Sequence, residues 1–177
     1  WDAAGDERRA LPATIDAGRA AQRTFAWSDA YRLDRRALEL WDQADDPESV
    51  AGSHASLLMC AAYVAEDAGE TERSLALVNA ALDELDPEKD REDRIEALLV
   101  KSRTKASLMT IGGVEPLREA LALLPADADP KLRARVLEML ARRTTLQGDI
   151  GQGVEYAQQA VDAAAAAKSD SATANAW

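Results

Sequence analysis

The chain has 177 residues, enough for one domain with a substantial interior or for a repeat array of similar mass. Apolar residues make up 47% of it and aromatic residues only 5%, and this Ala- and Leu-rich composition favours helices, so we predict an all-α fold. The formal net charge of −11 argues against binding of nucleic acid or of an anionic membrane surface through this chain, because both are polyanions.

Three further features bear on where the chain works. Cys60 is the only cysteine and lies in an apolar run, which predicts a buried, unreactive thiol and fits a reducing cytoplasm. No apolar stretch approaches the roughly 18–20 residues that span a bilayer, and the N-terminus lacks the profile of a signal peptide. Because the chain does not begin with Met, we expect it to be a piece of a longer protein. The single cysteine and the lack of a membrane-spanning or signal segment lead us to expect that this protein acts in the cytoplasm.

Apolar spacing and helix-ending residues predict eight helices and the beginning of a ninth. In chain order they lie near residues 7–24, 28–43, 51–68, 71–85, 91–109, 115–124, 130–147 and 150–167, with a ninth starting near 171. Pro12 predicts that the first helix starts late or kinks. Gly112, Gly113 and Pro116 predict that the sixth helix starts late and is short.

A repeat is visible in the second helix of each predicted pair. Its marker alanines, Ala37, Ala81, Ala120 and Ala160, are separated by 44, 39 and 40 positions. A glycine followed by an acidic residue comes 12 positions before a small residue three times, at Gly5, Gly69 and Gly148. This pattern is typical of a tight turn between two helices, because glycine accepts the left-handed conformation that ends a helix.

We therefore predict an α-solenoid of antiparallel helix pairs, since neither helix of a pair can bury its apolar stripe alone. The chain is predicted to be one helical repeat domain over residues 1–177. Its units are placed at 1–45, 46–87, 88–127 and 128–169, with the start of another at 170–177.

The small residues Ala62 and Ala141, the glycine turns, and the later Ala81 and Ala160 together resemble the tetratricopeptide repeat. The usual period of that repeat is about 34 residues, so spacings near 40 imply longer helices or links. The aromatic positions of the repeat are weakly kept. Non-aromatic residues stand at four of them, namely Asp34, Ala65, Val78 and Thr144.

A second resemblance rests on the opening of the chain and on the second predicted helix. Trp1-Asp2-Ala3-Ala4-Gly5-Asp6, Arg9-Ala10-Leu11-Pro12-Ala13 and the stretch from Tyr31 to Trp41 are similar to the helical region of actinobacterial LuxR-type ATP-binding transcription regulators and related signal-transduction ATPases. The resemblance implies a part in effector sensing, autoinhibition or assembly. Walker motifs and a DNA-reading helix are not among these residues, so ATP hydrolysis and DNA binding are not implied for this chain. The alternative is a tetratricopeptide adaptor of another signalling or chaperone assembly.

The resemblance to the tetratricopeptide repeat also implies that the solenoid is a right-handed superhelix, with a concave groove lined by the first helix of each pair. The candidate groove residues are Arg19, Arg23, Tyr63, Arg103, Arg135 and Arg142. Arginines in an acidic protein can hold a carboxylate or phosphate through two parallel hydrogen bonds, so a protein segment or small anionic effector is the expected ligand. The alternative is that these arginines pair with Glu66, Glu138 or nearby loops. Apolar faces at the ends of the array also predict self-association.

The sequence offers no catalytic constellation, so we predict a protein that is not an enzyme and that needs no metal or cofactor. His54 is the only histidine, and we interpret it as a surface or capping residue. The glycines from Gly148 to Gly153 lack the preceding strand of a dinucleotide loop and the Gly-Lys-Ser/Thr of a P-loop.

Overall fold

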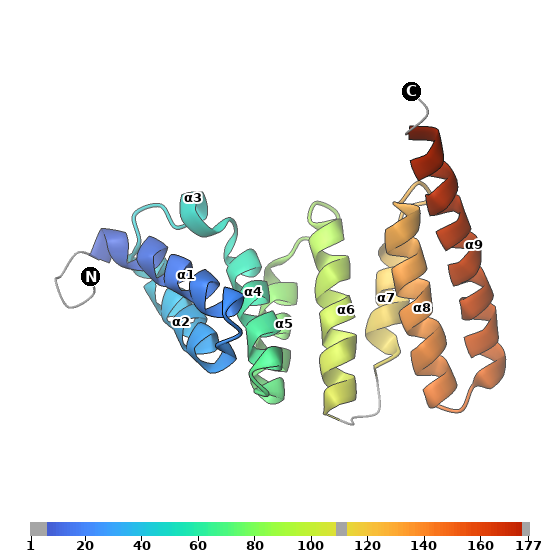
Figure 1. Cartoon of the computed structure of the whole chain (residues 1–177), viewed down its shortest axis with the longest axis horizontal. Helices are drawn as coiled ribbons and strands as arrows, with labels where there is room; N and C mark the ends of the chain where they lie inside the picture. Colours follow the sequence, from blue (N-terminus) through green and yellow to red (C-terminus); the bar gives the residue numbers. More distant parts are fainter. Residues whose placement is uncertain (1–6, 109–112, 175–177) are drawn as a thin grey trace. The chain divides into compact units, whose positions relative to one another are not determined.

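A computed structural model describes residues 7–108 and 113–174, and side chains at 10–108 and 113–167. Every regular element of these residues is a helix, and the helices pack in neighbouring pairs (Figure 1), which confirms the all-α prediction. The chain falls into two compact units, unit 1 (Trp1–Leu85) and unit 2 (Asp86–Trp177). The right-handed superhelix stays a prediction.

Unit 1 contains α1 (Glu7–Arg23), α2 (Trp27–Leu40), α3 (Glu48–Ala51), α4 (His54–Asp67) and α5 (Thr71–Glu84). The helices α1 and α2 form one antiparallel pair, α4 and α5 form the next, and α2 packs on α4 (Figure 1). A short 3₁₀ turn, Trp41–Gln43, ends α2. The four-residue α3 lies in the link between the pairs and was not among the predicted helices.

The core of unit 1 is made where three helices meet. One cluster joins Leu11 of α1, Leu40 of α2 and Leu57 of α4, and a second joins Tyr31 of α2 to Val64 of α4. Each helix brings a narrow apolar stripe to these clusters, so burial requires neighbouring helices on both sides.

Unit 2 contains α6 (Arg91–Ser107), α7 (Glu115–Leu123), α8 (Pro130–Leu146) and α9 (Ile150–Ala174). Each helix packs against the next, so α6 and α8 run parallel on either side of the shorter α7 (Figure 1). Leu137 of α8 packs with Ala160 and Ala163 of α9, and Leu121 of α7 joins them from the other side.

One helix end differs from the predictions and two agree. The first helix runs from Glu7 to Arg23, close to its predicted bounds, and continues through Pro12, so of the two alternatives for the proline a late start is wrong. The last helix continues without a break to Ala174, so no new helix begins near residue 171 in the described residues. The sixth predicted helix, α7, is short and begins only at Glu115, as expected; Gly112 lies outside the described residues.

The turns within three of the pairs use one left-handed residue each. Gly69 between α4 and α5 has φ of 82°, and Gly148 between α8 and α9 has φ of 96°. Both precede the marker alanine of their pair by 12 positions. The residue 12 positions before Ala37 is Phe25, which has φ of 59° and is the left-handed residue of the turn between α1 and α2.

Candidate functional site

The candidate residues of unit 1 lie around a polar contact between three helices. Gln22 of α1 donates from Nε2 to Oδ2 of Asp34 on α2 at 3.4 Å and to Sγ of Cys60 on α4 at 3.7 Å. Arg19, one turn earlier on α1, is exposed and lies 3.8 Å from Asp16 in an ion pair. Of the other predicted residues, Arg23 comes directly after Gln22 on α1, and Tyr63 comes three residues after Cys60 on α4.

Asp34 is the buried acid of this contact and is only 3% exposed. Burial raises its pKa to about 6, although the hydrogen bond from Gln22 and the charge of Arg19 act in the opposite direction. The sequence signal for this residue was a lone carboxylate on an apolar face, between Tyr31 and Ala37. Sequence reasoning identifies Asp34 only as a departure from the repeat pattern and misses it as a site residue.

Cys60 is half-buried rather than buried, which corrects the sequence prediction. Burial and the neighbouring Asp34 raise the pKa of its thiol, against the hydrogen bond from Gln22 and the charge of Arg19. A thiol with a raised pKa carries little thiolate at neutral pH, which agrees with the predicted lack of reactivity.

The candidate residues of unit 2 lie on one strip of surface along α6 and α8. Arg135 of α8 donates from Nη1 to Oε1 of Glu96 on α6 at 2.7 Å, so these two residues lie at the same level along the axes of the two helices. The two helices are parallel, and Arg103 and Arg142 each come seven residues, or two turns, later. We call this surface the α6–α8 strip; it comprises Glu92, Glu96, Arg103, Leu132, Arg135, Glu138 and Arg142.

The end of the strip at Arg142 is basic. Arg142 is exposed, and its Nε lies 4.0 Å from Oε1 of Glu138, the pairing that we considered as the alternative to ligand binding. The next residue, Arg143, is half-buried, and its pKa is lowered by burial and by the charge of Arg142. Two adjacent guanidinium groups that repel each other favour an anion nearby.

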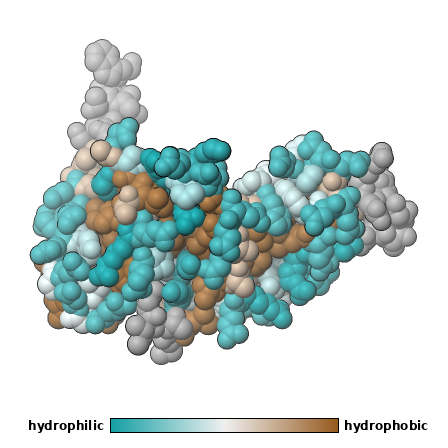
Figure 2. Space-filling model, turned by 180° about the vertical axis from the view of Figure 1, so that it is seen from behind, coloured by the Kyte–Doolittle hydropathy of each residue, from teal (hydrophilic) through white to brown (hydrophobic). Residues whose placement is uncertain are grey.

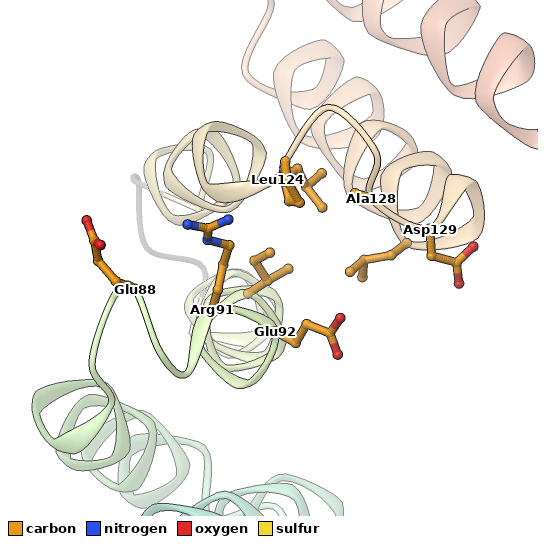
Figure 3. Close-up of a pocket in the computed structure, with 9 residues that line it drawn as sticks. Glu88, Arg91, Glu92, Leu124, Ala128 and Asp129 are labelled. Carbon is orange, nitrogen blue, oxygen red and sulfur yellow. The ribbon is translucent and has the colours of Figure 1, made fainter.

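The opposite end of the strip opens into a cavity of about 260 Å³ between the first turns of α6 and α8 (Figure 3). Its apolar lining includes Ile95, Leu124 and Leu132. Charged residues stand at its rim: in Figure 3 the Glu92 and Asp129 carboxylates lie on one side and the Arg91 guanidinium on the other. The volume lies just under the roughly 300–1,000 Å³ of ordinary small-molecule sites, so it suits a single side chain.

The other sequence candidates have structural roles. His54 is the first residue of α4, and its Nδ1 lies 2.7 Å from Oε1 of Glu84 while its ring lies against Trp41. Gly148 forms the turn, and Gly153 lets α8 and α9 approach closely. No group of three or more His, Cys, Asp or Glu side chains could hold a metal ion within the described residues.

None of the helices in the described ranges has the length and apolar character needed to cross a membrane. The face drawn in Figure 2 is mostly hydrophilic, with apolar patches among the hydrophilic residues, some of them at the left, over the C-terminal helices. A scan against models of protein families finds no match for this chain, and a search among curated proteins finds no match either. The resemblance to the tetratricopeptide repeat and to LuxR-type regulators therefore stays a prediction.

Proposed function

We propose that this chain is a non-catalytic scaffold that binds a protein segment, or a small anionic effector, along the α6–α8 strip. The observation that carries the proposal is the arrangement of charge on parallel helices. The Glu96–Arg135 pair shows which residues of the two helices lie at the same level. An apolar cavity with Glu92 at its rim lies toward the N-terminal ends of the helices, and Arg103 and Arg142 lie toward their C-terminal ends.

The dimensions of the strip suit a short extended segment. Glu92 and Arg103 are eleven residues apart on α6, which at 1.5 Å per residue is about 16 Å. An extended chain covers that length in about five residues at roughly 3.3 Å each. Such a segment would place an apolar or cationic side chain in the cavity and a carboxylate or phosphate beside Arg142.

Helix dipoles supply a structural alternative for the same charges. Acidic residues in the first turns of a helix and basic residues near its end stabilise the helix without any ligand. Stability measurements alone would not separate the two roles, so the test must measure binding.

The probe is a short labelled peptide with a lysine near one end and two glutamates about five residues away. We expect it to bind the protein, as measured by fluorescence anisotropy, and to bind less well when its glutamates are replaced by glutamines. Arg103→Ala with Arg142→Ala should lower the affinity by about tenfold, as expected for the loss of charge-assisted contacts.

A matched control carries Arg32→Ala and Arg73→Ala, which remove the same charge from exposed sites on α2 and α5. This control should keep the wild-type affinity within about twofold. Absence of peptide binding by the wild type, or an equal loss in both double variants, would refute the proposal.

The setting that we propose is the sensor or oligomerisation region of a LuxR-type ATP-dependent transcriptional regulator in the bacterial cytoplasm. The support is the resemblance of the chain's opening and of α2 to that family. The alternative is a tetratricopeptide adaptor of another signalling or chaperone assembly. The residues that flank this chain in its parent protein discriminate the two, because a Walker motif before it and a helix–turn–helix after it would favour the first.

A further inference from the structure

An apolar stripe runs along the exposed side of α9. Ile150 is 65% exposed, and Val154 and Val161 are 62% exposed each. With Ala157 and Ala164 these residues follow spacings of four and three, which place them on one face of the helix. We call this set, Ile150, Val154, Ala157, Val161 and Ala164, the α9 seam.

The opposite side of α9 already packs against α8, so the seam is a second apolar face. Ala160 and Ala163 lie against Leu137, and a Cβ added to Gly153 would collide with Thr145 of α8. Between the two helices an open hollow of about 550 Å³ adjoins the seam; Arg135 and Glu138 of α8 and Val161 of α9 are among the residues that line it. Soluble proteins seldom leave large aliphatic side chains gathered on one exposed face unless the face binds something.

Equivalent faces elsewhere in the chain show what covers such a seam. Taking Ala37 and Ala160 as equivalent, Tyr31 and Leu38 of α2 correspond to Val154 and Val161, and both lie in the clusters that α2 shares with α4. Taking Ala120 instead, Leu121 of α7 corresponds to Val161, and it packs against α8. In both units the covering element is the first helix of the following pair.

One first helix exposes the matching surface. Taking Gly18 and Ala62 as equivalent, the α4 residues Leu57, Ala61 and Val64, all buried, correspond to Ala13, Ala17 and Ala20 of α1. On α1, Ala17 and Ala20 are exposed and Ala13 is half-buried. The chain thus carries both halves of the contact that its own pairs make, a seam on α9 and a small-residue face on α1.

The charges of the two surfaces are also complementary. The same register places Asp16 of α1 where α4 has Cys60, and Arg142 of α8 where α1 has Arg19. The charge of Arg19 acts on Cys60 within unit 1. In the equivalent contact, Asp16 and Arg142 would therefore form an attractive pair of opposite charges.

We propose that the α9 seam of one copy of this chain binds the exposed face of α1 of a second copy, so that the chain associates head to tail. Such a heterologous contact leaves one seam and one α1 face open at the ends of every assembly. The proposal does not depend on the α6–α8 strip as a ligand site, and its decisive variants lie outside that strip.

The experiment measures mass against protein concentration by sedimentation velocity. The wild type should form dimers and longer species as its concentration rises. Val154→Glu with Val161→Glu, which blocks the seam, and Ala17→Glu, which blocks the α1 face, should each leave a monomer. A mixture of these two variants should form a one-to-one dimer, because the Ala17→Glu variant keeps an intact seam and the seam variant keeps an intact α1 face. Nothing larger should form, since both intact surfaces are used in that dimer.

The mixture also controls for folding, since two misfolded variants could not complement each other. Gln158→Glu adds a charge to an exposed position of α9 outside the seam and should associate like the wild type. A wild type that stays monomeric at all concentrations would overturn the proposal. An Ala17→Glu variant that still dimerises would also overturn it. That result would mean that two α9 seams bind each other, or that the copies associate through another surface.

Discussion

The carboxylate of Asp34 lies directly against Gly18: a Cβ added to the glycine would be 2.9 Å from Oδ1 of the aspartate. The two residues come from the paired helices α1 and α2, and Asp34 is buried there with Gln22 as its hydrogen-bond donor. Gly18 is therefore the residue that lets α1 approach α2 over a buried acid. A larger residue would push the carboxylate or the helix aside.

We first predict that Gly18→Ala destabilises the protein in one background and stabilises it in another. In the wild type the added methyl group meets the carboxylate, and the free energy of unfolding should fall by roughly 1–3 kcal/mol. In the Asp34→Ala background the obstacle is gone, and replacement of a glycine inside a helix should gain up to about 1 kcal/mol. Urea denaturation of the four proteins measures the coupling, and equal effects in both backgrounds would contradict it.

The second prediction concerns pH. The pKa of Asp34 rises from its ordinary value of 3.8 to about 6 in the folded protein, so the folded state holds the proton more tightly than the unfolded state between those values. Stability attributable to Asp34 should therefore fall as pH rises from about 4 to about 6, by up to roughly 3 kcal/mol. In the Asp34→Asn variant the free energy of unfolding should lose this dependence on pH. At pH 7 it should be higher than that of the wild type.

Asp29→Asn is the control for this measurement, because Asp29 is an exposed carboxylate on the same helix, with 68% of its side chain accessible. At pH 7 its free energy of unfolding should stay within about 1 kcal/mol of the wild type. If Asp34→Asn runs parallel to the wild type from pH 4 to pH 7, the carboxylate is not titrating as the structure indicates.

The helices were predictable from the sequence because their apolar periodicity and their proline- and glycine-bearing ends are local signals. The eight predicted helices correspond to α1, α2 and α4–α9 of the structure. The polar contact of Gln22, Asp34 and Cys60 was not predictable, since it joins residues 12 and 38 positions apart on three helices. Similarly, the sequence indicates that arginines line the first helices, but only the structure shows that Arg135 pairs with Glu96 and thereby which residues of the strip lie at the same level.

Phe25 shows how a turn can escape a search for glycines. It has the left-handed conformation that Gly69 and Gly148 have in the equivalent turns, and its ring lies 5.7 Å from that of Trp27, edge to face. A non-glycine residue in this conformation costs roughly 1–2 kcal/mol. Periodicity gave no sign of this position, because Phe25 lacks the glycine marker that identified the other two turns.

The third prediction follows from the conformation of this turn. Phe25→Gly relieves the backbone strain but loses the ring contact, worth roughly 0.5–1.5 kcal/mol, so we expect the free energy of unfolding to change by between a loss of about 0.5 and a gain of about 1.5 kcal/mol. Gly69→Ala places a Cβ in the same conformation without any new contact and should cost about 1 kcal/mol. Thermal unfolding that shows Phe25→Gly to be as destabilising as Gly69→Ala would contradict a shared left-handed turn.

The fourth prediction separates two glycines that lie two positions apart on α9. A Cβ on Gly153 would collide with Oγ1 of Thr145 and lie 3.2 Å from the carbonyl oxygen of Ala141, so Gly153→Ala should force α9 away from α8 and cost roughly 1–3 kcal/mol. A Cβ on Gly151 would meet only Oδ1 of Asp149, at 3.9 Å, so Gly151→Ala should be neutral or stabilise the helix by up to about 1 kcal/mol.

This pair also decides why the segment from Gly148 to Gly153 is rich in glycine. Close packing requires only Gly153 and the turn requires only Gly148, whereas a phosphate-binding loop would depend on the space at Gly151 as well. Thermal unfolding of the two alanine variants, with Thr145→Ala added to Gly153→Ala to recover part of the loss, measures the packing role. If Gly151→Ala proved as damaging as Gly153→Ala, close approach of α8 and α9 could not be the reason for these glycines.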